Sequence, residues 1–140
     1  MIRGGLLSLA LVCMVGGTAT AADLNITIAG VRSDQGQMRL ALFNNPVDFP
    51  NGRSVVTRNL PARTGEMTVV LEGLTPGPYA LALHHDENAN GKMDTSLLGL
   101  PQEGYGFSND APVFLGAPPF DAAAVTLPEE GRSITARMVY

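Results

Sequence analysis

The chain has 140 residues, a formal net charge of −4 at pH 7 and no tryptophan. Nucleic acids and anionic membrane surfaces are bound through clustered Lys and Arg side chains, so this acidic chain without a basic cluster argues against both as partners. The length suits one domain with a hydrophobic core of its own.

The N-terminal residues have the pattern of a cleaved signal peptide. Arg3 gives a positive start, residues 6–15 form an apolar run, and small residues at 19–21 suit a signal peptidase. Cleavage after Ala21 and cleavage after Ala22 fit equally well. The apolar run is shorter than the roughly 20 residues that a membrane helix needs, and no later stretch is apolar enough to span a bilayer.

We therefore predict an exported protein, located in the periplasm or outside the cell. Residues 1–22 are the predicted signal peptide, and residues 23–140 form a single domain. The only cysteine, Cys13, lies in the segment that is removed. The stability of the mature chain must then come from its core or from a metal ion, because no disulfide is possible.

Alternation of apolar and polar residues predicts a series of short β-strands, and no stretch has helical periodicity over three turns. Residues 33–37 form a turn, so the first two strands are expected to pair as an opening hairpin. The fifth strand is apolar on both faces, which is typical of a central strand whose alanine side packs against bulky residues. The predicted strands span residues 24–31, 38–43, 54–58, 66–72, 78–85, 120–127 and 133–140.

Two loop regions are expected to be ordered. Phe49 can place its ring beneath the loop of residues 44–52, which is rich in chain-breaking residues. The Gly- and Pro-rich segment 99–109 is long for a loop in a compact domain, and such segments are commonly functional. Its predicted anchors are Leu97, Leu98, Leu100, Tyr105 and Phe107. The whole pattern predicts an all-β fold, an antiparallel β-sandwich of about seven strands.

The stretch that follows the fifth strand has the spacing of a calcium-binding loop. Asp86, Asn88 and Asn90 carry oxygen-bearing side chains at alternate positions, followed by Gly91 and Asp94. These are the first, third, fifth, sixth and ninth places of such a loop, where alternate side chains converge on one point. Glycine at the sixth place permits the sharp turn that closes the loop.

The match is incomplete at its end. The twelfth place, which normally holds a bidentate Glu, is Leu97, and a strand rather than a helix leads into the loop. The missing ligand must come from elsewhere, with Glu103 the first candidate and Glu87 and Asp110 in reserve. An oxygen-only ligand set favours calcium over zinc or copper. The predicted calcium ligands are Asp86, Asn88, Asn90, Lys92 (through its backbone carbonyl), Asp94 and Glu103.

An ion-free turn is the alternative interpretation of the same residues. Asn and Asp side chains commonly bond to their own backbone in polar turns. Two carboxylates about 5 Å apart repel each other by roughly 3 kcal/mol at an effective dielectric constant near 20. The acidic side chains must therefore either surround a cation or point away from one another into water.

The chain has two histidines, His84 and His85, at the end of the fifth predicted strand. Strand alternation sends their side chains to opposite faces, so they cannot easily bind one ion together. An alternative interpretation is that the protein is a periplasmic hydrolase that uses His84 or His85 together with Asp86. Ser96 and Ser108 lack the context of an activated nucleophile, so no catalytic residue is predicted.

Three blocks of the sequence together resemble a known family. The first is Leu74-x-Pro-Gly-x-Tyr-Ala, the second is the loop from His85 to Asp94, and the third is Gly-Leu-Pro-x-Glu-Gly-Tyr-Gly-Phe-Ser-Asn at 99–109. The combination resembles the bacterial secreted family called domain of unknown function 2141. The first block is also similar to the turn of immunoglobulin-like and prealbumin-like sandwiches. The resemblance implies export and such a sandwich fold, and it pairs the loop with the 103–109 segment, but it implies no established activity.

These observations predict a non-enzymatic, exported β-sandwich with a calcium-stabilised loop, acting as a binding or envelope-associated module. Its partner would be a protein or a small molecule of unknown identity, bound at the rim that the loop and the 103–109 segment form. The alternatives are the hydrolase described above and a structural envelope protein without an ion.

Overall fold

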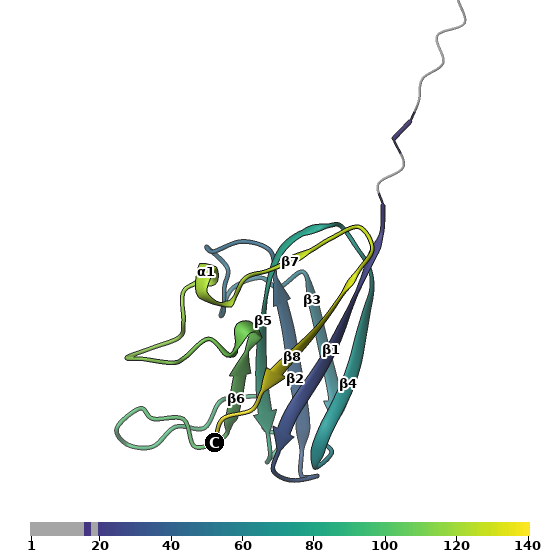
Figure 1. The fold of residues 1–140 in the computed structure, drawn as a ribbon. Coiled ribbons are helices and arrows are strands. Elements are labelled where there is room, and N and C mark those ends of the chain that lie inside the picture. The colour runs from purple at the N-terminus through teal and green to yellow at the C-terminus, as the bar shows by residue number, and fades with distance from the viewer. Residues whose placement is uncertain (1–15, 18–19) are drawn as a thin grey trace, which may run out of the picture.

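The protein is a β-sandwich of two facing sheets (Figure 1). The computed structural model describes residues 16–17 and 20–140, so most of the predicted signal peptide lies outside the described residues. One sheet has the strand order β4-β1-β8, and the other has the order β3-β2-β5-β6, with β7 paired to β5. The strands are β1 (Ala22–Val31), β2 (Gln37–Phe43), β3 (Val56–Pro61), β4 (Gly65–Leu74), β5 (Gly77–Asp86), β6 (Gly104–Phe107), β7 (Val125–Leu127) and β8 (Arg132–Arg137).

The hydrophobic core lies between the two sheets. Alternate apolar residues of each strand point inward, because successive side chains of a strand face opposite sides of the sheet. Ile26 of β1 and Leu81 of β5 are fully buried in this core. This confirms the predicted fold class and the alternation from which it was derived.

A second, aromatic cluster covers part of the outer face of the larger sheet. Phe49 packs edge-on against Phe43, Phe107 and Phe120, with ring centroids 5.5 to 6.0 Å away. Ala80 of β5 is buried in the same cluster. The expectations that Phe49 lies beneath its loop and that the alanine face of the central strand meets bulky residues are therefore confirmed for this end of the strand.

Two expectations about the strands were wrong. The first two strands do not form a hairpin: β1 pairs with β4 and β8, whereas β2 pairs with β3 and β5, so the turn at 33–37 crosses between sheets. Within the mainly antiparallel sandwich, the pair β1–β8 is parallel. The segment 120–127 begins with a helical turn, α1 (Phe120–Ala123), which precedes β7 and places Phe120 in the aromatic cluster. No helix among the described residues is long and apolar enough to cross a bilayer.

Ser108 ties the end of β6 to two neighbouring segments. It begins the short turn η1 (Ser108–Asp110) and is fully buried. Its hydroxyl accepts a hydrogen bond from the Leu81 N–H at 2.9 Å and donates one to the carbonyl of Ala123. The side chain thus satisfies backbone groups of β5 and α1 that would otherwise be buried without partners.

We expect Ser108→Ala to lower the free energy of unfolding by about 1 to 3 kcal/mol, because it leaves a buried N–H and a buried carbonyl unpaired. Equilibrium unfolding in urea measures this change. Ser133→Ala removes an exposed hydroxyl from β8 and is the matched control, expected to change stability by less than about 0.5 kcal/mol. Equal effects of the two substitutions would contradict the role assigned to Ser108.

Candidate metal centre

Strand β5 delivers the chain to the candidate site at one end of the larger sheet. Its alternation places His85 toward the core, whereas His84 and Asp86 lie on the outer face. In the pairing of β5 with β6, His84 lies opposite Tyr105 and His85 opposite Gly104. Asp86 ends β5 and Glu103 directly precedes β6, so the antiparallel pairing of the two strands brings these residues close together.

The loop after β5 is organised by the Asp86 carboxylate, which is 1% exposed. Its Oδ1 accepts a hydrogen bond from the Asn90 N–H at 3.1 Å, and its Oδ2 accepts one from the Gly91 N–H at 2.8 Å. Gly91 has a φ of +77°, a conformation that suits glycine. The Asn90 side-chain oxygen in turn accepts the Lys92 N–H at 2.9 Å. The acid and amide oxygens of the loop therefore accept hydrogen bonds from the backbone of the same loop.

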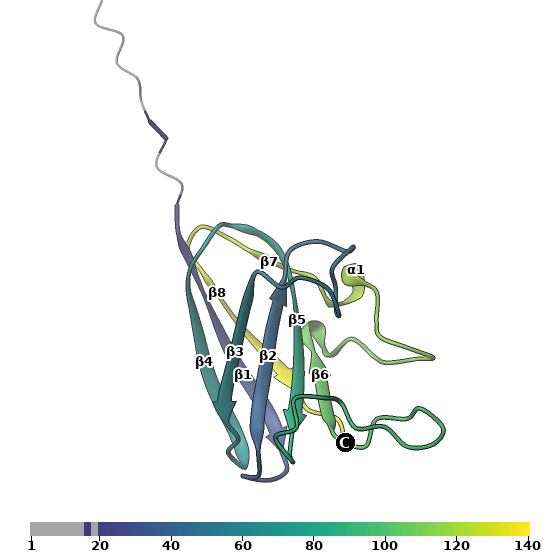
Figure 2. The ribbon, with the colours of Figure 1, turned by 180° about the vertical axis from the view of Figure 1, so that it is seen from behind.

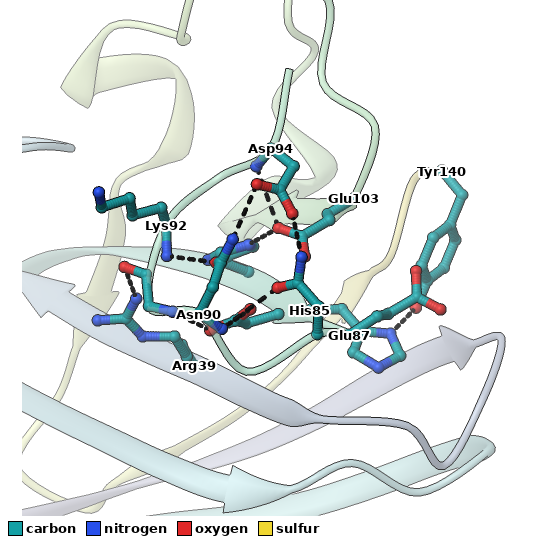
Figure 3. A network of polar contacts seen from close by, with 12 residues as sticks. Arg39, His85, Glu87, Asn90, Lys92, Asp94, Glu103 and Tyr140 are labelled. Atoms are coloured by element: carbon teal, nitrogen blue, oxygen red, sulfur yellow. Dashed lines mark hydrogen bonds and ion pairs between the residues drawn. The ribbon is translucent and has the colours of Figure 1, made fainter. Parts of the chain in front are cut away.

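Asp94 closes the loop on the other side. The side-chain amides of Asn88 and Asn90 both donate hydrogen bonds to its carboxylate (Figure 3). The pKa of the Asp94 carboxyl is lowered, first by the bond from Asn90 and then by the bond from Asn88. These contacts hold a negative charge at the mouth of the loop.

Glu103 is buried against the loop with one carboxylate oxygen unpaired. The side chain is 6% exposed, and its Oε2 lies 2.7 Å from His84 Nε2 and 3.2 Å from the Asp94 N–H that donates to it. Its Oε1 is buried, and no described residue forms a hydrogen bond with it. Ligand atoms of His84, Asp86 and Glu103 all lie within 4.8 Å of one another. One oxygen of Glu103 is thus fixed by two contacts, while the other is left for a further partner.

The structure brings most of the predicted ligands into one hydrogen-bonded group. Asp86, Asn88, Asn90, Asp94 and Glu103 belong to it, and the backbone N–H of Lys92 contacts it. The reserve residues lie outside this group: Glu87 pairs with Arg32, and Asp110 accepts the Arg137 N–H. The bond from Arg32 lowers the pKa of the Glu87 carboxyl.

His84 is the site residue that the predicted ligand set lacked. The signal was present in the sequence, because His84 and Asp86 are two apart in a strand and therefore share a face. The predicted leucine anchors of the following segment were wrong: Leu97, Leu98 and Leu100 are 107%, 86% and 61% exposed. Tyr105 and Phe107 of β6, in contrast, do pack in the aromatic cluster.

His85 occupies a separate polar cluster on the inner side of β5. Its ring is fully buried, with Nδ1 2.7 Å from the Tyr140 hydroxyl and Nε2 2.8 Å from the Gln35 carbonyl. The Arg32 guanidinium lies over the Tyr140 ring, 4.3 Å from its centroid. Both ring nitrogens of His85 are therefore engaged in holding the turn and the C-terminal residue together.

The fold and the site define a small β-sandwich in which the 86–94 loop and Glu103 form an acidic group at one end of the larger sheet. The family model described as "Uncharacterized protein conserved in bacteria (DUF2141)" matches residues 26–135, and the chain belongs to this family. No match was found among curated proteins or among solved structures.

The lowered pKa of Asp94 gives a pH prediction. A carboxyl whose pKa is lower in the folded than in the unfolded chain adds stability above its ordinary pKa, and this stability is lost as the pH falls through the folded value. In chelator-treated protein, NMR titration should place the Asp94 pKa below the ordinary 3.8. Removing both amides with Asn88→Ala and Asn90→Ala should raise it toward that value.

The control is Asn44→Ala, which removes an amide from a distant loop and should leave the Asp94 pKa unchanged. If the Asp94 pKa stays the same after both loop amides are removed, their hydrogen bonds do not stabilise the Asp94 carboxylate.

Proposed function

We propose that this protein is an exported, non-enzymatic β-sandwich module that binds a calcium ion between the 86–94 loop and Glu103. The ion would fasten the loop to the end of β6 and so stabilise the rim of the larger sheet. The observation that carries the proposal is the Oε1 atom of Glu103, which is buried and has no hydrogen-bond partner among the described residues.

The energetics of burial support a cation at this position. A buried polar atom without a hydrogen bond costs about 1 to 3 kcal/mol, and more when it belongs to a charged group. The nearby Asp86 carboxylate adds repulsion of roughly 3 kcal/mol at about 5 Å and an effective dielectric constant near 20. A divalent cation would offset both costs, because it supplies the missing partner of Oε1 and neutralises the two acids.

The donor set supports calcium in particular. The group contains the carboxylates of Asp86, Asp94 and Glu103. It also contains the side-chain oxygens of Asn88 and Asn90, each of which accepts a backbone N–H of the loop. Hard oxygen donors of this kind, six to eight in number, are typical of calcium sites. His84 would act as a positioning residue, since its contact with Oε2 turns the other oxygen of Glu103 toward the ion.

The hydrolase alternative has less support from the contacts. His85 is fully buried with both ring nitrogens engaged, and His84 contacts Glu103 through Nε2. The ion-free alternative is supported by the hydrogen bonds that Asp86 already accepts from the loop backbone. It leaves Glu103 Oε1 without a partner, and for that reason we favour the ion.

Calcium titration of chelator-treated protein tests the proposal. We expect calorimetric binding with a dissociation constant of about 10⁻⁴ to 10⁻³ M, the range of extracellular calcium modules. At about 10 mM calcium this affinity stabilises the fold by about 1.4 to 2.7 kcal/mol, which a thermal scan detects as a rise of several degrees. Neither heat nor a thermal shift would contradict the proposal and favour the ion-free turn.

The substitution Glu103→Gln keeps the size of the side chain but removes its charge. We expect it to weaken calcium binding by about tenfold or more, because a charge-assisted contact is lost. Glu129→Gln makes the same change in charge at the exposed turn before β8 and should leave binding unchanged. Equal calcium affinities of the two variants would exclude Glu103 as a ligand.

Export is tested separately. Protein purified from the periplasm or medium of an expressing bacterium should begin at Ala22 or Asp23 when its N-terminus is sequenced. A variant lacking residues 2–15 should remain inside the cell at full length. A secretion-competent host that retains the whole chain, with Met1 present, would contradict export.

A further inference from the structure

The outer face of the larger sheet contains a groove beside the candidate metal centre. Its volume is about 510 Å³, and its lining comes from β2, β3, β5, β6 and three loops. Small-molecule sites in proteins commonly have volumes of about 300 to 1,000 Å³. The groove lies between the aromatic cluster at one end of the sheet and the 86–94 loop at the other.

The sheet register explains why this part of the face is hollow. Ala41 of β2 lies directly opposite Ala82 of β5, so the centre of the face carries two methyl groups where larger side chains would fill the space. Phe107 flanks this pair on β6. The three loops complete the lining with Pro50, Asn51, Gly91, Met93 and Ala117.

The next row of the register is polar and carries a cation. Arg39 of β2 lies opposite His84 of β5, which lies opposite Tyr105 of β6. Arg39 is half-buried, and its guanidinium donates a hydrogen bond to the Gly91 carbonyl (Figure 3). Among the described residues, no carboxylate lies within ion-pair distance of it. One end of the groove thus presents a half-buried guanidinium that has no ion-pair partner among the described residues.

We propose that this groove binds a small organic carboxylate. The acid group pairs with the Arg39 guanidinium, whose planar fork matches the two oxygens of a carboxylate. The apolar body of the ligand lies over Ala41 and Ala82, against the ring of Tyr105. This proposal goes beyond the calcium site and does not require it, because the floor and Arg39 belong to strands that the fold itself positions.

The test uses 3-phenylpropanoate and its neutral amide, 3-phenylpropanamide, which have nearly the same shape and differ in charge. In NMR titrations of ¹⁵N-labelled protein, the acid should shift the amide signals of Arg39, Ala41, Ala82 and Tyr105. The neutral amide should bind at the same place about tenfold or more weakly, because a hydrogen bond between charged groups is lost. Equal affinities, shifts that cluster elsewhere, or no shifts at about 10 mM of either compound would overturn the proposal.

Two variants separate the contribution of the Arg39 charge to binding from the contribution of the space above Ala82. Arg39→Gln should weaken binding of the acid to the level of the amide, whereas Arg58→Gln, the same change at an exposed position on β3, should have no effect. Ala82→Leu should fill the floor and weaken binding of both compounds. The ¹⁵N spectrum of each variant reports whether it is folded. An Arg39→Gln protein that binds the acid as tightly as the natural one would overturn the proposal.

Titrations in calcium and in chelator separate this proposal from the previous one. If the protein binds the acid more tightly than the neutral amide but does not bind calcium, the carboxylate-binding groove is supported and the proposed calcium site is contradicted. Calcium binding in a protein that does not distinguish the acid from the amide would support the metal centre and overturn the groove.

Discussion

The strict alternation of strand β5 is the constraint on which the rest of the structure depends. Leu81 and His85 point into the space between the sheets, whereas Ala82 and His84 face outward. Strand β5 is paired on both sides, by β2 and by β6. A shift of its register by one residue would exchange its two faces, so this pairing fixes which side chains point inward. The same strand therefore builds the core with one set of residues and both proposed sites with the other. In the two opposite views of Figures 1 and 2, it runs through the middle of the larger sheet.

The two proposed sites are joined by a short chain of contacts across this outer face. His84 stands between them: its ring contacts Glu103 on the loop side and lines the groove on the other. Arg39 links them again, because it lines the groove and bonds to the Gly91 carbonyl within the loop. Ordering of the loop by a cation would therefore also fix the guanidinium that faces the groove. The structure offers a direct route by which binding at one site can affect the other.

Sequence reasoning predicted the sandwich and the loop because both depend on local spacing. Period-2 alternation located the strands, and the Asp86 to Asp94 spacing located the curl. Strand partners depend on contacts far apart in the chain, which is why the expected β1–β2 hairpin was wrong. The groove was also missed, since it arises only when Ala41 and Ala82 become neighbours on adjacent strands. Leu97 is exposed although it was expected to anchor the 99–109 segment, because an apolar side chain is not by itself evidence of burial.

The position of the tyrosines has a practical consequence for spectroscopy. The chain has three tyrosines and no tryptophan, so its near-ultraviolet emission comes from tyrosine alone. Tyr105 lines the groove, and the Tyr140 ring packs so closely against Gly104 that a Cβ there would lie 2.3 Å from a ring carbon. Tyr79 is buried near the other end of β5, with its hydroxyl bonded to the Thr75 carbonyl. The unlabelled protein thus has two fluorescent side chains at β6, Tyr105 within the strand and Tyr140 packed against it, and a third, Tyr79, remote from them.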